Sequence, residues 1–418
     1  MIPLLKVLAV VFCLSALVAG QAPRLWVLMA PDSAIEYDPA NFSRRHAVTV
    51  PAEVLKSPKI FQVNREGQML YAPNSEDPSP DVGKSGERFW FWNGQAASML
   101  GREIIRISSP SGSNQKVSES SPWPFLSADG AHLFWFTNQH DKLERENVEL
   151  SVKTSFQAWQ SDVGGKQKQT IARTEFPECR CDTGVCTETC PEASFWTPEG
   201  GVQDYFVLTR MIQGQTETQY LSTSVYRQAE NNWAASDLKE PLQRVLDAAD
   251  HGGVILSAIL DTGCCGWENQ SNDQTVLWKG EKRTVVFDER VQFKNPDYDV
   301  SFFTENARLS PDLTRVAMTV MASAKSSAPI QLSEDGQANP AESLRIRKAL
   351  GELPEVVVVS SEDPAKRTAV PHAHLVGWLN EKEILIVENH VLVAYNVVAG
   401  TRRRSTIKVE DPAFVVLR

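Results

Sequence analysis

Short apolar runs follow polar turns at intervals along the chain, and the same order of turn and strand recurs. Each turn combines Asn, Ser, Thr or Pro with an acidic residue and often Gly. Such side chains hydrogen-bond nearby backbone and Gly tolerates positive φ, so each turn predicts a hairpin followed by a buried strand. The copies are VNREGQMLYAP (63–73), LSADGAHLFWFT (126–137), WTPEGGVQDYFVLTR (196–210), the degenerate DAADHGGVILSAI (247–259), LSPDLTRVAMTV (309–320) and WLNEKEILIVEN (378–389).

Further apolar strands follow these copies. They are RFWFWNG (88–94), FQAWQSD (156–162), TVLWKGEKRTVVFDE (275–289) and VLVAYNVVAGTRRRSTIKV (391–409). Each copy with its following strands fits four short antiparallel strands. Measured from the turn residues, the copies are about 52 to 70 residues apart. Such units repeated along one chain are the signature of a β-propeller. The predicted fold class is therefore all-β, with a single β-propeller of four-stranded antiparallel blades.

The two ends of the chain predict how the ring closes. Residues 24–51 have the pattern of strands without a starting turn, and DPAFVVLR (411–418) is a lone strand after the last unit. If both segments share one blade, no sheet edge is left open where the ends meet. Six internal units and one shared blade give seven blades, with six or eight as the alternatives because one copy is degenerate. We expect residues 21–418 to form this one domain.

One segment departs from the β pattern. Within ANPAESLRIRKALGEL (338–353), Asn339 can cap a helix, Pro340 fits the first helical position and Gly351 fits the stop. We expect a short surface helix near 339–350, inserted in a loop between strands.

The turn motifs resemble a known repeat. LSADGAHLFWF and LSPDLTRVAM, with the closing segment GWLNEKEILIVENHVLVAYNVVAGTRRRS, resemble the repeat of the TolB-like, WD-repeat-like secreted propellers. The resemblance covers most of residues 55–418 and implies an exported propeller that binds proteins or small ligands. It carries over no catalytic residue, and the cysteine-rich segments have no counterpart in the repeat.

The first residues predict export. Lys6 precedes an apolar run from Val7 to Val18 and small residues follow, which is the layout of a signal peptide ending at Gly20. A run of roughly 12 apolar residues is shorter than the ~20 that a spanning helix needs. We therefore expect a signal peptide over residues 1–20, a periplasmic or extracellular mature chain, and no membrane span after cleavage.

Composition and charge narrow the class of partner. The hydrophobic content of 42% is enough for a large core, and the net charge is −10. The largest basic block is TRRRS (401–405), which argues against nucleic acid as a partner. We expect a monomer that binds a protein or a cell-envelope component and needs no cofactor.

Six cysteines are expected to form three disulfides, or two disulfides and a free pair. They are Cys179, Cys181, Cys186 and Cys190 in PECRCDTGVCTETCPE (177–192), and Cys264 and Cys265 in DTGCCGWEN (261–269). Exported thiols meet an oxidising compartment, and a loop without apolar periodicity gains its order from cross-links. The spacing C-x-C-x4-C-x3-C differs from zinc patterns such as C-x2-C, so a metal is the weaker interpretation.

The pairing of these cysteines stays open. Neighbouring Cα atoms are about 3.8 Å apart, below the usual disulfide range of about 4.4–6.8 Å, so a Cys264–Cys265 bridge would be strained. The alternative is that each bonds a cysteine of the 177–192 segment in the neighbouring blade. A vicinal bridge resembles that of the quinone-dependent alcohol dehydrogenases, but the repeated tryptophan motif of that family is missing here.

Two other groups are weak candidates for chemistry. His372 and His374 in PHAH (371–374) are expected on one face of a strand, as half of a metal site or, more simply, as a hydrogen-bonded pair between blades. An acidic region could supply the carboxylates of a glycosidase or a calcium site, although such residues are usually turn formers. Its members are Asp261, Glu268, Asp297 and Asp299.

The predicted function is a binding or scaffolding module whose disulfide-stapled loop presents a recognition surface. The alternative is a propeller enzyme, a hydrolase or lyase with carboxylates in the central funnel, and a quinone-dependent oxidoreductase is more remote. The sequence has no G-x-S-x-G elbow and no phosphate-binding glycine loop. No residue is therefore assigned a catalytic role, and a non-enzymatic function is favoured.

Overall fold

Strands dominate the part of the chain that the structure describes. The computed structural model describes residues 23–29, 33–50, 58–64, 67–73, 90–99, 116–120, 125–127, 131–144, 149–163, 169–175, 179–182, 190–196, 202–203, 205–213, 218–229, 232–238, 243–249, 254–260, 272–288, 293–295, 298–326 and 353–417, with isolated positions 167, 341, 344, 345, 348 and 351. Within these ranges one short 3-10 helix, η2 (Pro412–Phe414), precedes the last strand.

Six sheets have the four-stranded antiparallel form of a propeller blade, and we number them along the chain. Blade 1 contains β1 (Leu25–Met29), β2 (Ser33–Tyr37), β3 (Arg44–Thr49) and β32 (Val415–Leu417). Blade 2 contains β4 (Pro58–Val63), β5 (Met69–Pro73), β6 (Trp90–Trp92) and β7 (Ala97–Met99). Blade 3 contains β14 (Cys190–Trp196), β16 (Tyr205–Gln213), β17 (Thr218–Ala229) and β18 (Asn232–Asp237).

The remaining three blades follow in the C-terminal half. Blade 4 contains β19 (Gln243–Ala249), β20 (Val254–Leu260), β21 (Asn272–Lys279) and β22 (Lys282–Asp288). Blade 5 contains β24 (Tyr298–Leu309), β25 (Arg315–Ser326), β26 (Glu355–Ser360) and β27 (Arg367–Pro371), with the short β23 (Phe293–Asn295) added beside β24. Blade 6 contains β28 (Ala373–Trp378), β29 (Glu383–Glu388), β30 (Val391–Asn396) and β31 (Arg402–Lys408).

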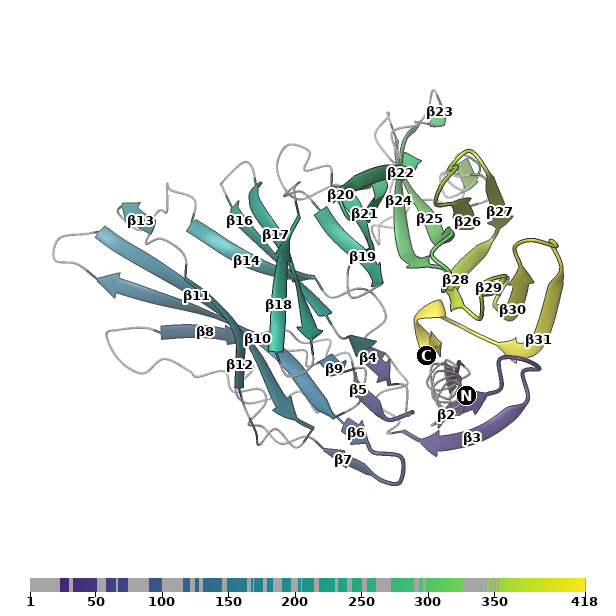
Figure 1. Ribbon diagram of the computed structural model, residues 1–418, viewed down its shortest axis with the longest axis horizontal. Helices are drawn as coiled ribbons and strands as arrows, with labels where there is room; N and C mark the ends of the chain where they lie inside the picture. The colour runs from purple at the N-terminus through teal and green to yellow at the C-terminus, as the bar shows by residue number, and fades with distance from the viewer. Residues whose placement is uncertain are drawn as a thin grey trace, which may run out of the picture.

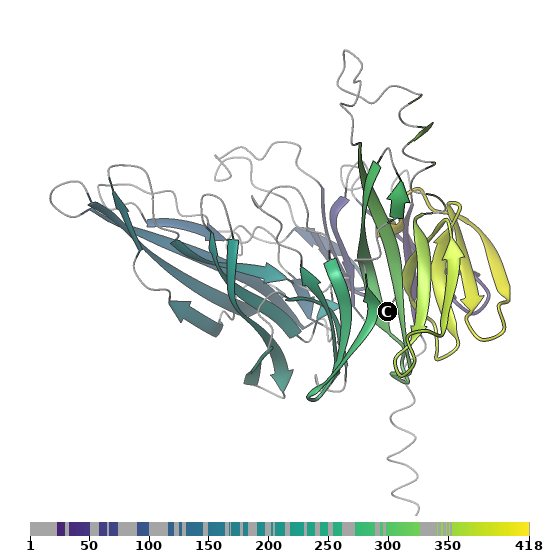
Figure 2. The same cartoon turned by 90° about the horizontal axis from the view of Figure 1, so that it is seen from above.

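A seventh sheet, which we call the wide sheet, lies between blades 2 and 3. It contains β8 (Lys116–Ser120), β9 (Phe125–Ser127), β10 (His132–Glu144), β11 (Glu149–Asp162), β12 (Gln169–Glu175), β13 (Cys179–Asp182) and β15 (Val202–Gln203). Its strands β10 and β11 have 13 and 14 residues, more than twice the usual five or six. Figure 1 and Figure 2 show these two strands extending away from the blades.

The expectation of seven regular blades needs correction. Strand β10 pairs with β9 and further along with β8, and β11 pairs with β12 and further along with β13. With β15, this sheet has seven strands in place of four. The described residues therefore form six regular blades and one widened sheet. A long uninterrupted hairpin leaves extra edge length with which further strands can pair. The repeat pattern of the sequence does not predict this longer hairpin.

Neighbouring sheets contact each other in chain order. The pairs in contact include β4 with β9, β11 with β14, β19 with β24, and β24 with β28. Strand β32 pairs antiparallel with β1 and contacts β28, so the two ends of the described chain lie in one sheet, next to blade 6. Figure 1 shows the last strands, in yellow, beside the first ones, in purple.

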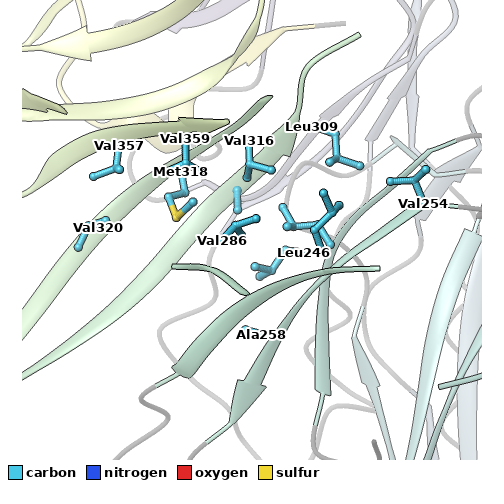
Figure 3. Packing of buried hydrophobic residues seen from close by; sticks show 13 residues of the cluster. Leu246, Val254, Ala258, Val286, Leu309, Val316, Met318, Val320, Val357 and Val359 are labelled. Carbon is cyan, nitrogen blue, oxygen red and sulfur yellow. The ribbon is translucent and has the colours of Figure 1, made fainter. Parts of the chain in front are cut away.

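The hydrophobic core lies in the seams between sheets. Strand β29 shows the principle: Ile384 and Ile386 pack against blade 5, whereas Leu385 and Val387 pack against blade 1. Successive side chains of a strand point to opposite faces, so a strand buried on both faces is continuously apolar. Figure 3 shows the seam between blades 4 and 5, where Met318 lies among the side chains of both sheets.

The predicted turns are confirmed where the structure describes them: LSPDLTRVAM joins β24 to β25, WLNEKEILIVEN joins β28 to β29, and the described part of VNREGQML lies between β4 and β5. In LSPDLTRVAM, the Ser310 hydroxyl accepts from the Arg315 amide at 2.9 Å and the Asp312 carboxylate accepts from the Thr314 amide at 3.2 Å. In VNREGQML, the Asn64 side chain accepts from the Gln68 amide at 2.8 Å. Gly67 has φ +81°, and a Cβ there would lie 2.5 Å from the Arg24 guanidinium.

The predicted helix is described only at separate positions. Ala341, Leu344, Arg345 and Lys348 have helical backbone and exposed side chains. The bounds near 339–350 lie outside the described residues, as does most of the loop at 177–192.

Met318→Ala tests the seams. Met318 is fully buried between blades 4 and 5, and truncating such a side chain leaves a cavity that lowers the free energy of unfolding by about 2–5 kcal/mol. Urea denaturation of purified protein measures the loss. Val398→Ala is the control, because Val398 is 62% exposed and should change stability by less than about 0.5 kcal/mol. Equal effects for both variants would contradict a core located in the seams.

Candidate functional site

The arginine strand β31 is the outermost strand of blade 6, and a tight turn positions it. The Asn396 side chain accepts hydrogen bonds from the amides of Val398 at 3.0 Å and Ala399 at 2.8 Å. Gly400 then takes φ +69°, in the left-handed region that favours glycine. The chain thereby reverses and enters β31 at Arg402, with Arg402 opposite Tyr395.

Two arginines of β31 share one buried carboxylate. The Glu388 side chain is 7% exposed, and its oxygens accept from the guanidiniums of Arg402, at 3.2 Å, and Arg404. The Arg402 guanidinium also lies 5.1 Å from the ring centre of Tyr395. A buried carboxylate needs such partners, and in return it holds both guanidiniums in place although their side chains are 38% and 53% exposed.

Arg403 points the other way and joins blade 6 to blade 1. Its guanidinium donates to the Pro39 carbonyl at 3.1 Å and lies 4.9 Å from the ring centre of Phe42. Phe42 is presented by a turn in which it has φ +59° and its amide donates to the Asp38 carbonyl at 2.7 Å. The three arginines are thus fixed on both faces of one strand.

Basic residues continue onto the neighbouring blade. Arg45 on β3 forms an ion pair with Asp38 at 2.7 Å. The pKa of Asp38 lies below its ordinary value, mainly because its carboxylate accepts a hydrogen bond from the Ala40 amide and, second, because it accepts one from Arg45. Arg44 is exposed beside it.

The outer strands of four consecutive blades carry the same sign of charge. Their basic residues are Lys282 and Arg283 on β22, Arg367 on β27, Arg402, Arg403, Arg404 and Lys408 on β31, and Arg44 and Arg45 on β3. A single acidic residue, Asp288, lies on these strands. The outer strands of blades 2 and 3 and of the wide sheet carry no such excess: their sequences are ASM, NWAASD and QTIARTE.

The cysteine-rich segments are only partly described. Cys179 and Cys181 lie on β13, at the far end of the wide sheet, and Cys190 begins β14 of blade 3. Strands β13 and β14 contact each other. Cys186, Cys264 and Cys265 lie outside the described residues, so the disulfide prediction stays a prediction.

The acidic candidates are not brought together by the described residues. Asp299 lies on β24, opposite Lys294. Asp261, Glu268 and Asp297 fall outside the described ranges, so the prediction of catalytic or calcium-binding carboxylates stays open.

The histidine prediction needs correction. Strand β28 begins at Ala373, and His372 lies in the preceding turn, exposed and with φ +52°. His374 is on the strand and half buried, so the two do not share one strand face. Burial lowers the pKa of His374 below its ordinary value; nearby Asp411 opposes this shift and nearby His390 adds to it. Among the described residues, no three His, Cys, Asp or Glu side chains are placed to hold a metal ion.

The sequence contains a signal for the arginine strand beyond the argument against nucleic acid. TRRRS follows a turn in an outer hairpin, and basic residues recur at the start of the outer hairpin strand in TVLWKGEKRTVVFDE. Basic residues at these equivalent positions indicate a charged rim. The role of Glu388 could not be recognised, because strand β30 separates it from the arginines and no local pattern encodes a contact across that strand.

No protein-family model matches the chain, and no curated protein matches it. Solved structures with similar folds include the WD40 domain of SCAP from fission yeast, with 8% identity and TM-score 0.32 over 94% of this chain and 88% of that one. Dipeptidyl peptidase 4 of Porphyromonas gingivalis has 9% identity and TM-score 0.37 over 91% of this chain and 57% of that one. A protein of unknown function from Bacteroides caccae has 10% identity and TM-score 0.29 over 84% and 94%.

At these scores the superpositions add nothing to what the sheet topology shows. The four-stranded antiparallel blades identify a β-propeller directly. Among the described residues, no helix has the length and apolar character needed to cross a membrane.

His374 predicts a loss of stability in mild acid. A histidine with a lowered pKa in the folded state binds its proton more weakly than in the unfolded chain, so stability decreases as the pH falls below about 6.5. We expect the melting temperature to fall from pH 7.5 to 5.5, and to fall less in His374→Gln. His372→Gln, an exposed neighbour, is the control. An identical pH dependence in wild type and His374→Gln would show that burial of this histidine does not matter.

Proposed function

We propose that the chain is an exported propeller that acts as a binding or scaffolding module. In this proposal the wide sheet contributes β9–β12 as a seventh blade, and β32 closes the ring through its pairing with β1. A closed ring gives a rigid scaffold, on which loops and outer strands can present side chains without changing the core. The repeat pattern that resembles TolB-like propellers agrees with this assignment, and so does the N-terminal signal pattern.

The observation that carries the proposal is the fixed arrangement of three arginines on β31. Arginines left free on a surface lose conformational entropy when they bind, whereas these three are already held by Glu388, Tyr395 and the turn of blade 1. Pre-positioned guanidiniums are typical of surfaces that bind carboxylates or phosphates. We therefore propose β31 as the recognition surface.

The cysteine-rich loop belongs to the proposal as a second presented element. The contact between β13 and β14 brings the backbone segments of Cys179, Cys181 and Cys190 near one another. This supports at least one bridge within the 177–192 segment, joining the wide sheet to blade 3. Peptide mapping by mass spectrometry of the unreduced exported protein tests it: six free thiols would refute the stapled loop.

Photo-crosslinking in living cells tests the recognition surface. A photoreactive amino acid replaces Thr406, which is exposed on β31, or Thr170, which is exposed on β12 of the wide sheet. The full-length chain, including its first 20 residues, is produced in its source cells and irradiated. We expect a discrete crosslinked partner from position 406 and none from position 170.

Crosslinks of equal yield from both positions would indicate unspecific collisions and contradict the proposal. A partner captured only at position 170 would move the recognition surface away from β31.

A further inference from the structure

Strand β31 is an open sheet edge. It ends the order β28–β29–β30–β31, and within the described residues it pairs with β30 alone. Its regular part places Arg402, Arg403 and Arg404 opposite Tyr395, Ala394 and Val393, before the register shifts. An edge strand presents a row of backbone donors and acceptors that an extended polypeptide can pair with.

The charge along this edge is incompletely balanced. Arg402 and Arg404 share the single carboxylate of Glu388, so one positive charge is left over. Lys408, on the same strand, adds another and is exposed. A carboxylate of a ligand can therefore bind the guanidiniums of Arg402 and Arg404, which are already oriented and still partly exposed.

Charge on edge strands has a simpler explanation, which is protection against edge-to-edge aggregation. Charges of either sign serve that purpose, and a chain with net charge −10 has more acidic than basic residues to use. On the outer strands of blades 4, 5, 6 and 1, the charged residues are nevertheless basic except for Asp288, whereas the other three outer strands show no excess of basic residues. Protection alone does not account for one sign on four neighbouring blades, whereas attraction of an acidic partner does.

A polypeptide fits this surface better than another polyanion does. Seven of the basic residues on the four outer strands are arginines, Arg44, Arg45, Arg283, Arg367, Arg402, Arg403 and Arg404, and the planar guanidinium matches a carboxylate with two parallel hydrogen bonds. A polysaccharide or a phosphate polymer can match the charge, but it lacks the regularly spaced N–H and C=O groups that continue a strand ladder at the open edge. An extended acidic peptide meets both.

We propose that β31 binds an extended acidic peptide segment of a partner protein, which adds as a further strand to blade 6. Side chains of a strand alternate between its two faces, so carboxylates at every second position reach Arg402 and Arg404, and further carboxylates reach the basic strands of blades 5 and 1. The inference rests on the recognition surface proposed above and names the chemistry of its partner.

Fluorescence anisotropy with a labelled peptide tests the inference. The probe has about 12 residues that alternate glutamate and threonine, enough to span one edge strand. Three proteins are compared at the same ionic strength: wild type, the neutral variant Glu388→Gln/Arg402→Gln/Arg404→Gln, and Arg173→Gln on β12. The last two change the net charge by the same amount. We expect the neutral variant to bind about tenfold or more weakly, and Arg173→Gln to bind like wild type.

The variant Arg402→Lys/Arg404→Lys is the control for a folding defect in the neutral variant. It keeps the charge and the ion pairs with Glu388 but loses the planar fork, so we expect folded protein with several-fold weaker binding. A peptide N-methylated at alternate residues should also bind about tenfold more weakly, because it cannot complete the strand ladder.

Three results would overturn the inference. They are equal affinities for wild type and the neutral variant, unchanged binding of the N-methylated peptide, and tighter binding of a sulfated polysaccharide or polyphosphate of matched charge. These three results do not depend on the photo-crosslinking test. If a partner is captured at position 406 and one of these results is also obtained, the binding module is retained and only the acidic-peptide inference is rejected.

Discussion

The structure depends on apolar contact between the faces of neighbouring sheets. Strand β29 is buried on both faces, so its side chains pack in two seams at once: Ile386 faces blade 5 and Leu385 faces blade 1. Burying a side chain of this size contributes about 1.5–3 kcal/mol. No blade can form its core alone, and the terminal strand β32, whose Val415 packs with Leu25 and Leu385, completes the last seam.

The same seams determine where polar groups lie. Three donors find their partners across the seams: the Leu309 amide donates to Asp247 at 2.8 Å, the Leu375 amide to Thr319 at 2.8 Å, and the Trp378 indole to the Arg308 carbonyl at 3.1 Å. Because unpaired buried groups are costly, these bonds fix the register between blades. On the outer strand β31, Arg402 and Arg404 stay partly exposed and are held by Glu388.

The sequence predicted the repeated elements well and the exceptions poorly. Turns such as that at Ser310–Thr314 are encoded locally by side chains that bond their own backbone, so a single sequence reveals them. The widening of the sheet around β10 and β11 depends on their pairing with β8 and β13, and no local pattern of the sequence encodes that pairing. His372 lies outside the predicted strand because its backbone is in the left-handed region and forms a turn. The site at β31 needs Glu388, and that pairing exists only in the folded blade.

The central claim is that β31 is a pre-positioned edge for an acidic partner, and hydrogen–deuterium exchange of the backbone measures it most directly. Addition of the glutamate–threonine peptide should slow exchange at Arg402–Arg404 and leave β12 (Gln169–Glu175) unchanged, because new strand pairing protects the amides at that edge alone. Unchanged exchange along β31, or protection confined to the cysteine-bearing strands β13 and β14, would contradict the account.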